Sequence, residues 1–312
     1  MTVEIKSSLD SQQSPASRPR RSFLAKALGL GGAGVASVLG ARRAARAQTT
    51  ATVNDPAILN FALNLEYLEA EYYTYAVTGQ SIAANGIAIN GMGTGGPTTV
   101  KPGARVPFQT PMIQQFAMEL AIDEQKHVAD IRGLLAQAGA TPIAKPAIDL
   151  LNSFNLAARL AGLGNTFDPF ANETNFLLGS YIFEDVGVSA YHGAAPLIKN
   201  KDVLSYAAGI YAVEGYHAGT IRLMLNQLGQ SAATEAISNV RKSASGANDD
   251  YGVGDGAMDN APGSGQSSII LTDSGGASFA RTFTQVLRIV YLNSASATPG
   301  GFFPKGVNGT IR

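Results

Sequence analysis

The 312-residue sequence contains no cysteine. Disulfide bonds, metal sites built from thiolates and catalysis by a cysteine nucleophile are therefore excluded. Histidine is almost as scarce, with three residues in the chain, and charged residues make up only 15% of it. Neither sign of charge is in excess, because 23 basic residues balance 23 acidic ones. In such a chain, a histidine placed beside a glutamate on a helix needs an explanation.

The first 47 residues have the features of an export signal. Arg20 and Arg21 open the stretch RRSFL, a short apolar run rich in Gly and Ala follows, and residues 45–47 (ARA) look like a cleavage site. These features resemble a twin-arginine signal peptide and predict a periplasmic or extracellular protein. A membrane anchor or a basic disordered arm is the alternative. Glycines and Lys26 interrupt the apolar run, which makes it a poor membrane-spanning helix.

Removal of residues 1–47 would leave an acidic chain. The leader holds eight basic and two acidic residues, so 15 of the 23 basic and 21 of the 23 acidic residues remain, a net charge of −6. An acidic chain without a basic stripe is not expected to bind nucleic acid. No other segment reaches spanning length, so no stable membrane insertion is expected after cleavage. The remaining 265 residues suffice for one large domain with extensions.

Apolar residues at helical spacing predict four long helices, at residues 55–77, 111–138, 172–194 and 202–228. The first opens with Asp55 as N-cap and a proline at the first helical position. A Gly-rich loop of about thirty residues separates the first two helices, and a connection with a short helical piece near 156–163 separates the second and third. A hairpin, a long crossover and a second hairpin predict an all-α, ferritin-like four-helix bundle over residues 48–230.

Residues 231–312 are expected to form a C-terminal extension that packs on the bundle. Apolar residues recur at helical spacing over 279–292 and predict a fifth, short helix. The stretch around 248–265 is rich in acids and glycine but lacks the spacing of an EF-hand loop, so a solvated loop is expected there. Strand content should be negligible.

Two of the three histidines occur in a repeated pattern. Glu124 and His127 lie in an apolar helical segment, and ninety residues later the same pattern returns with Glu214 and His217. Residues three apart lie on one face of a helix, so each pair can point at a common place. A single histidine on an apolar helix is more often a core residue than a ligand. Two Glu-x-x-His pairs among three histidines favour metal binding.

Glu184 would add a ligand from the third helix. Its flanks are apolar, and no lysine or arginine lies within that helix. A lone buried carboxylate is costly unless protonation, a salt bridge or a metal neutralises it. Metal ligation is therefore the favoured interpretation of Glu184.

The first helix offers three further candidates, Glu66, Glu69 and Glu71. The first two share a helix face, whereas Glu71 is expected to point to solvent. Glu66 is preferred because Tyr73 follows it by two helical turns, just as Tyr191 follows Glu184. Glu69 remains open as the alternative ligand.

Together these residues resemble the carboxylate-bridged di-iron centre of the ferritin-like superfamily, in which two helices each supply a Glu and two each supply a Glu-x-x-His. IDEQKHVAD at residues 122–130 is similar to the second helix of bacterioferritins, and NLEYLEAEYY at residues 64–73 resembles the first helix of ferritins. The leader, the Gly-rich loop and residues 281–312 look like those of exported ferritin-like proteins related to plant desiccation-related proteins. These motifs are specific for a dinuclear metal site but not for one reaction.

The resemblance implies two Fe ions or, alternatively, two Mn ions, because carboxylate oxygens with one imidazole per ion suit these metals. Glu124 and Glu214 would bridge the ions. The other ligands would complete one ion each in pairs, Glu66 with His127 and Glu184 with His217.

The resemblance also suggests roles for residues around the ligands. Tyr73, Tyr191 and Tyr216 would supply a hydrogen bond or an electron, although most tyrosines in a bundle are simply core residues. Asp123 and Asp185 would orient the histidines, or are ordinary surface acids.

Three classes of function follow. The first is an exported dinuclear-metal oxidoreductase that oxidises Fe(II) or reduces or dismutates peroxide, with O2 or peroxide as its partner. The second is iron storage, which is disfavoured because the Gly-rich loop and the 80-residue tail would have to fit a tightly packed shell. The third is a stress- or desiccation-protective structural protein with a stabilising or vestigial metal site. Assembly into a homo-oligomer is compatible with all three.

Overall fold

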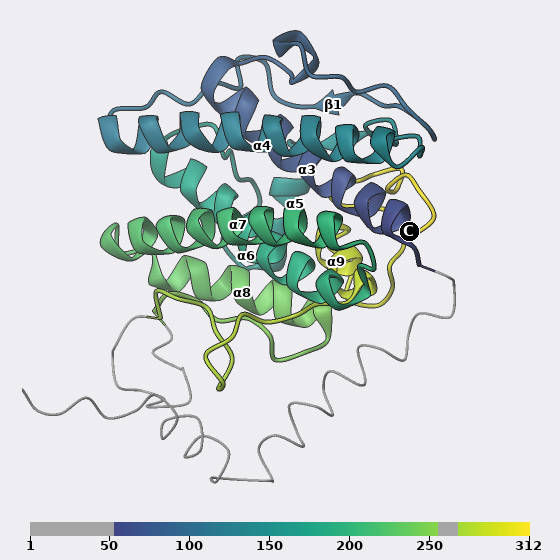
Figure 1. Cartoon of the computed structure of the whole chain (residues 1–312). Helices are drawn as coiled ribbons and strands as arrows, with labels where there is room; N and C mark the ends of the chain where they lie inside the picture. Colours follow the sequence, from purple (N-terminus) through teal and green to yellow (C-terminus); the bar gives the residue numbers. More distant parts are fainter. Residues whose placement is uncertain (1–52, 255–267) are drawn as a thin grey trace, which may run out of the picture. The chain divides into compact units, whose positions relative to one another are not determined.

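The computed structural model describes residues 53–254 and 268–312 (Figure 1). The predicted leader, residues 1–47, lies outside this part of the chain, so its role as an export signal stays a prediction. Within the described residues there are seven α-helices, and the two strands have only two residues each. The prediction of an all-α fold is confirmed. In the same residues, no helix is both long enough and apolar enough to cross a membrane.

Four long helices form the bundle: α3 (Asp55–Thr78), α4 (Pro111–Gln137), α6 (Glu173–Ala194) and α7 (Lys201–Gln227). α3 packs along α4, and α6 packs along α7. Contacts of α3 with α6 and of α4 with α7 close the bundle. Every bound of these helices lies within one residue of its prediction, because long apolar patterns at helical spacing specify such elements well.

The residue that caps the N-terminus of α3 differs from the predicted one. The N-cap is Asn54 rather than Asp55, and the Asn54 side chain accepts a hydrogen bond from the backbone N–H of Ala57 at 2.9 Å. The Asp55 carboxylate instead accepts from the backbone N–H groups of Lys199 and Asn200, at 2.9 and 2.7 Å. Asp55 therefore joins the first turn of α3 to the segment just before α7.

The Gly-rich loop, residues 79–110, pairs with the crossover between α4 and α6. It contains the single turn η1 (Ala83–Asn85) and β1 (Thr98–Thr99), and β1 pairs in parallel with β2 (Ile148–Asp149) of the crossover. α5 (Asn152–Leu160) follows β2 and begins four residues before the predicted helical piece. The turn η2 (Ala195–Leu197) leads from α6 towards α7.

Glu71 is buried, and the prediction that it faces solvent is wrong. The Lys145 ammonium lies 3.4 Å from Oε1 of Glu71 and donates hydrogen bonds to the Gly96 carbonyl and the Thr98 hydroxyl. The backbone N–H of Ile82 donates to Oε2 of Glu71 at 3.4 Å. The loop and the crossover thus cover a face of α3 that the helical pattern alone marks as polar.

The chain after α7 adds two helices to the bundle. α8 (Ser231–Ser245) is absent from the sequence-based prediction, whereas α9 (Phe283–Val290) lies within the predicted range 279–292. Thr282 and Gln285 form a capping box at the start of α9. α8 contacts α5, α6, α7 and α9, and α9 also contacts α6. Both helices therefore cover α6 (Figure 1).

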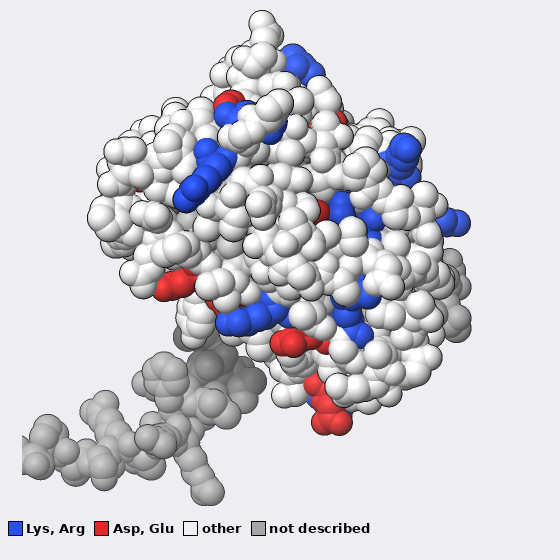
Figure 2. Space-filling model, turned by 90° about the horizontal axis from the view of Figure 1, so that it is seen from above, with Lys and Arg blue, Asp and Glu red and all other residues white. Residues whose placement is uncertain are grey.

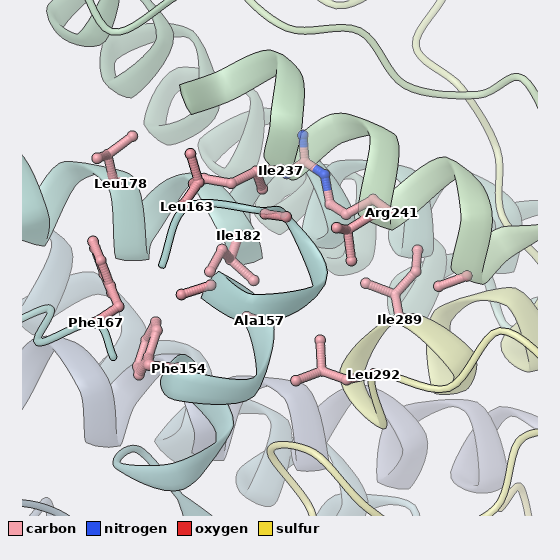
Figure 3. Close-up of a pocket in the computed structure, with 14 residues that line it drawn as sticks. Phe154, Ala157, Leu163, Phe167, Leu178, Ile182, Ile237, Arg241, Ile289 and Leu292 are labelled. Carbon is pink, nitrogen blue, oxygen red and sulfur yellow. The ribbon is translucent and has the colours of Figure 1, made fainter. Parts of the chain in front are cut away.

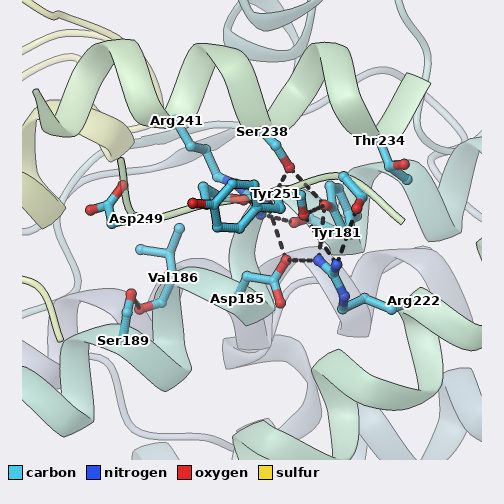
Figure 4. A network of polar contacts seen from close by, with 12 residues as sticks. Tyr181, Asp185, Val186, Ser189, Arg222, Thr234, Ser238, Arg241, Asp249 and Tyr251 are labelled. Carbon is cyan, nitrogen blue, oxygen red and sulfur yellow. Dashed lines mark hydrogen bonds and ion pairs between the residues drawn. The ribbon is translucent and has the colours of Figure 1, made fainter. Parts of the chain in front are cut away.

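A buried network of ion pairs fastens the extension to the bundle (Figure 4). Asp185 of α6 accepts from Arg222 of α7 and from Arg241 of α8, at 3.0 and 2.9 Å. Asp250 pairs with Arg241 and with Arg281, at 2.7 and 2.8 Å. Asp185 is thus neither the partner of a histidine nor a surface acid, and both suggestions made for it are wrong.

The surface carries little charge. On the face that Figure 2 shows, basic and acidic side chains form small separate groups among neutral residues. Several large apolar side chains are exposed on the bundle helices, among them Met112, Met118 and Ile122 of α4 and Tyr216 of α7. Much of the acidic charge lies instead in the interior of the bundle, where it forms the candidate site.

Candidate metal centre

Six side chains from the four bundle helices meet inside the bundle. α3 supplies Glu66, α6 supplies Glu184, and α4 and α7 each supply one Glu-x-x-His pair, Glu124 with His127 and Glu214 with His217. All six are buried, and none is more than 7% exposed. The three-residue spacing places the glutamate and the histidine of each pair on one helix face. Packing of the helices then turns these faces inward.

The first group of side chains surrounds the imidazole of His127. Its Nδ1 atom lies 3.2 Å from Oε2 of Glu66, 3.4 Å from Oε2 of Glu124 and 3.9 Å from Oε1 of Glu214. One ligand atom from each of these four residues lies within 4.8 Å of the others. Nitrogen and oxygen atoms about 2.0–2.2 Å from one ion lie about 3–4 Å from one another, so this spacing fits a single ion.

The second group surrounds His217 in the same way. Its Nδ1 atom lies 3.3 Å from Oε1 of Glu124 and 3.3 Å from Oε2 of Glu184, and Glu214 completes the group. Glu124 and Glu214 therefore belong to both groups. The two imidazole rings have their centroids 6.4 Å apart. This separation suits two ions at the spacing of about 3.5–4 Å that is typical of dinuclear sites.

Eight buried atoms of these groups have no hydrogen-bond partner in the described residues. They are Oε2 of Glu66 and of Glu184, both carboxylate oxygens of Glu124 and of Glu214, and Nδ1 of His127 and of His217. Buried polar atoms are normally paired, and unpaired ones are costly. Two cations, each held by four of these atoms, would satisfy all eight. The donor set therefore fits a dinuclear metal centre.

Two tyrosines, Tyr73, which is buried, and Tyr191, which is partly buried, hold the outer oxygens of Glu184 and Glu66. Tyr73 of α3 donates its hydroxyl to Oε1 of Glu184, and Tyr191 of α6 donates to Oε1 of Glu66. Each tyrosine thus holds the glutamate of the other helix, and each glutamate keeps one oxygen for the centre. Tyr216, the third tyrosine suggested by the sequence, is 73% exposed and faces solvent.

The outer edges of the histidines lie near the surface between α4 and α7. His127 and His217 are 7% and 5% exposed. Nε2 of His217 lies 3.7 Å from Oδ2 of Asp123, which is too far for a hydrogen bond. The Asp123 side chain is itself 37% exposed. This edge of the centre is therefore its polar, solvent-near side, and an orienting role for Asp123 stays a prediction.

The acidic side chains perturb one another strongly. Burial and the neighbouring glutamates raise the pKa of Glu69 and Glu214 well above the usual range. Burial also raises the pKa of Glu66 to about 7. Burial lowers the pKa of His127, but Glu124 and Glu66 more than offset this effect and raise it to about 11. These groups therefore hold their protons more tightly in the metal-free protein, and metal binding would displace the protons of the ligands.

Glu69 lies beside the centre but in neither group, whereas Glu66, the preferred candidate of α3, lies in the first. Gly187 of α6 makes room here, because a Cβ at this position would lie 2.1 Å from Oε2 of Glu214 and 3.6 Å from Oε1 of Glu69. Gly187 is not among the site residues predicted from the sequence. A glycine inside a helix, three residues after Glu184, was the available signal of close packing.

The sequence profile of the ferritin-like domain family matches residues 54–227, which include all six residues of the two groups. The chain is similar to the ferritin-like catalase Nec2 of Nesocodon mauritianus, with 28% identity over 269 residues that cover 81% of this chain and 83% of that protein.

A second similarity is to the desiccation-related protein PCC13-62 of Craterostigma plantagineum, with 31% identity over 176 residues. This match covers 55% of the chain and spans about half the length of that relative, 53%. No solved structure matches the chain.

Substitution of Gly187 by alanine should disrupt the centre, because the new methyl group would collide with Oε2 of Glu214. We expect metal affinity, measured by calorimetric titration of the metal-free protein, to fall about 10- to 100-fold. Gly215→Ala is the matched control, since that glycine is exposed in α7 and a Cβ there meets no atom within 4 Å. The control should bind metal normally and gain up to about 1 kcal/mol in helix stability. Equal affinity of the two variants would contradict the geometry.

The metal-free protein should lose stability as the pH rises from about 6 to 9. Burial raises the pKa of Glu66 to about 7, and Glu184 and Glu124 outweigh burial to raise the pKa of His217 to about 10. The folded chain then binds more protons than the unfolded chain in this range, so a rising pH favours unfolding. The melting temperature of protein freed of metal with EDTA should fall between pH 6 and pH 9. The melting temperature of metal-loaded protein, measured without EDTA, should fall less. A melting temperature of the metal-free protein that rises with pH would refute this account.

Proposed function

The chain belongs to the ferritin-like domain family, and on this premise we propose that it is an oxidoreductase with a dinuclear Fe or Mn centre that reacts with peroxide. The observation that carries the proposal is the set of eight buried, unpaired ligand atoms divided between two groups. Carboxylate oxygens with one imidazole per ion suit Fe and Mn. The two shared glutamates, Glu124 and Glu214, would bridge the ions. The other four residues would complete the ions in pairs, Glu66 with His127 and Glu184 with His217.

Peroxide is the favoured substrate because the similarity to a ferritin-like catalase extends over most of both chains. Its dismutation is therefore the first reaction that we propose. Oxidation of Fe(II) by O2 or by peroxide is a second reaction that the same kind of centre supports, since one ligand set serves several chemistries within this fold.

The chain's own residues prepare the site for this chemistry. A bound pair of ions would supply the electrons exchanged with peroxide. Tyr73 and Tyr191 fix the glutamates that they hold, so that one oxygen of each stays directed at the centre. The Glu69 carboxyl, kept protonated by burial and by the neighbouring glutamates, which raise its pKa, holds a proton beside the centre that a peroxide oxygen can accept.

A protective, non-catalytic role is the second candidate function. The similarity to a desiccation-related protein favours it, although that match covers only about half of each chain. In this case the ions would stabilise the bundle without turnover, as any ligand does that binds only the folded state. Melting temperature would then follow metal occupancy while peroxide stays unconsumed.

Replacement of Glu184 by glutamine should separate the two functions. Glutamine keeps the size of the side chain and an oxygen acceptor for Tyr73, but it removes the charge that helps to hold the second ion. We expect the metal content to fall from about two ions to about one, and peroxide consumption to fall at least about a hundredfold. Glu119→Gln, at an exposed position of α4, should change neither quantity.

The readouts are elemental analysis of protein purified from the export compartment and oxygen release from peroxide. Wild-type protein that holds two ions but consumes neither peroxide nor O2 would support the protective role. Wild-type protein that holds no ion at all would refute both.

We also propose that the twin-arginine pathway exports the protein. The proposal rests on Arg20 and Arg21, the apolar run and the ARA cleavage pattern. Replacement of both arginines by lysine should leave uncleaved precursor in the cytoplasm, as measured by fractionation and immunoblotting. The same replacement of Arg42 and Arg43, a second pair in the leader, is the control and should not impair export. Normal export of the Arg20, Arg21 variant would disprove the assignment.

A further inference from the structure

An apolar cavity opens to the surface beside the extension (Figure 3). Figure 3 shows side chains that converge on it, including Ala157 of α5, Ile182 of α6, Ile237 of α8 and Ile289 of α9. Nearly all of its wall is carbon. Leu163, at the rim, is 42% exposed and marks the opening. We call this space the outer cavity.

A second, smaller cavity lies between the outer cavity and the metal centre. Ile182 and Ile289 line both cavities and separate them. The inner cavity continues along α6 to Val186 and Gly187 and reaches Glu69 of α3. A Cβ on Gly187 would lie 2.1 Å from Oε2 of Glu214, so the far wall of this cavity is directly next to the centre.

The chemistry and the size of the two cavities restrict what can pass. Apart from Glu69, every side chain that lines the inner cavity is apolar, and its space admits about one water-sized molecule. A peroxide molecule would lose its hydrogen bonds to water on such a path, which is costly. A metal ion would lose its hydration shell. A small apolar molecule loses nothing comparable and gains from leaving water.

We propose that these cavities form a path for dioxygen between the surface and the metal centre, with Ile182 and Ile289 as its gate. The inference rests on the proposed function, in which dioxygen is either the product of peroxide dismutation or the oxidant of Fe(II). A diatomic molecule would pass when the side chains of these two buried isoleucines change their rotamers. In this proposal, ions and peroxide would reach the centre from its polar side instead, where His127 and His217 are 7% and 5% exposed.

The first test uses xenon, an apolar atom that enters dry cavities. Xenon is larger than a water molecule, so crystals of the wild-type protein under xenon pressure should show it in the outer cavity, whether or not metal is present. Ile289→Phe fills space on the wall that the two cavities share and should lower the xenon occupancy of the outer cavity. Leu287→Phe is the matched control, because Leu287 is buried in the same helix but lines neither cavity, and it should retain the xenon site.

The second test measures transport. Protein loaded anaerobically with Fe(II) is mixed rapidly with O2 or with hydrogen peroxide. For Ile289→Phe we expect oxidation by O2 to slow at least fivefold relative to Leu287→Phe, while oxidation by peroxide and the anaerobic affinity for Fe(II) stay within twofold. Ile182→Phe narrows the same gate from α6 and should behave alike, which keeps the test valid if one variant fails to fold.

The outcomes separate this inference from the proposed function. Absence of xenon from the wild-type outer cavity, or equal slowing of both oxidants in the gate variants, would overturn the path. Protein that binds xenon in the outer cavity but no metal would overturn the proposed function and leave the cavities as observed. Slowing of O2 alone in both gate variants would establish the path.

Discussion

The burial of carboxylates without lysine or arginine partners is the constraint on which the rest of this structure depends. Five glutamates that face or adjoin the candidate centre are buried in the bundle: Glu66, Glu69, Glu124, Glu184 and Glu214. In the described residues, no lysine or arginine forms an ion pair with any of them. Carboxylates removed from water in this way need protons or metal ions as compensation. The hydrogen bonds from Tyr73 and Tyr191 fix one oxygen each of Glu184 and Glu66, and Gly187 leaves room for Glu214. Both features would help to arrange the unpaired carboxylate oxygens around two ions.

The network around Asp185 and Asp250 shows the other solution to the same problem. Here the buried carboxylates meet three arginines, Arg222, Arg241 and Arg281, at distances of 2.7 to 3.0 Å. Arginine pairs with a carboxylate in fixed geometry and leaves no coordination position for an ion. Adjacent residues of α6 thus have opposite roles, since Glu184 faces the centre while Asp185 anchors α7 and α8. The difference between the arginine-paired aspartates and the glutamates without arginine partners favours metal binding, rather than a structural role, for the glutamate cluster.

The division between the bundle and the extension suggests how a common fold obtains its particular chemistry. The family match ends at residue 227, just before α8 begins. Within the matched part lie all six residues of the two groups. The extension supplies one wall of the outer cavity and, through Ile289 of α9, half of the proposed gate. In this arrangement the bundle would hold the ions, and the added helices would decide which small molecules reach them from this side.

The sequence by itself determined the four bundle helices and the types of residue at their centre, because helical periodicity and the Glu-x-x-His spacing are local properties of the chain. It also reduced the choice in α3 to Glu66 or Glu69. Only the tertiary structure placed Glu66 among the candidate ligands of the first ion and buried Glu71 against Lys145. It also paired Asp185 with arginines and packed α8 on α6. The spacing of residues within a helix predicts which of them share a face. The segments that cover that face, however, come from distant parts of the chain. Their positions follow from packing, which no short pattern encodes.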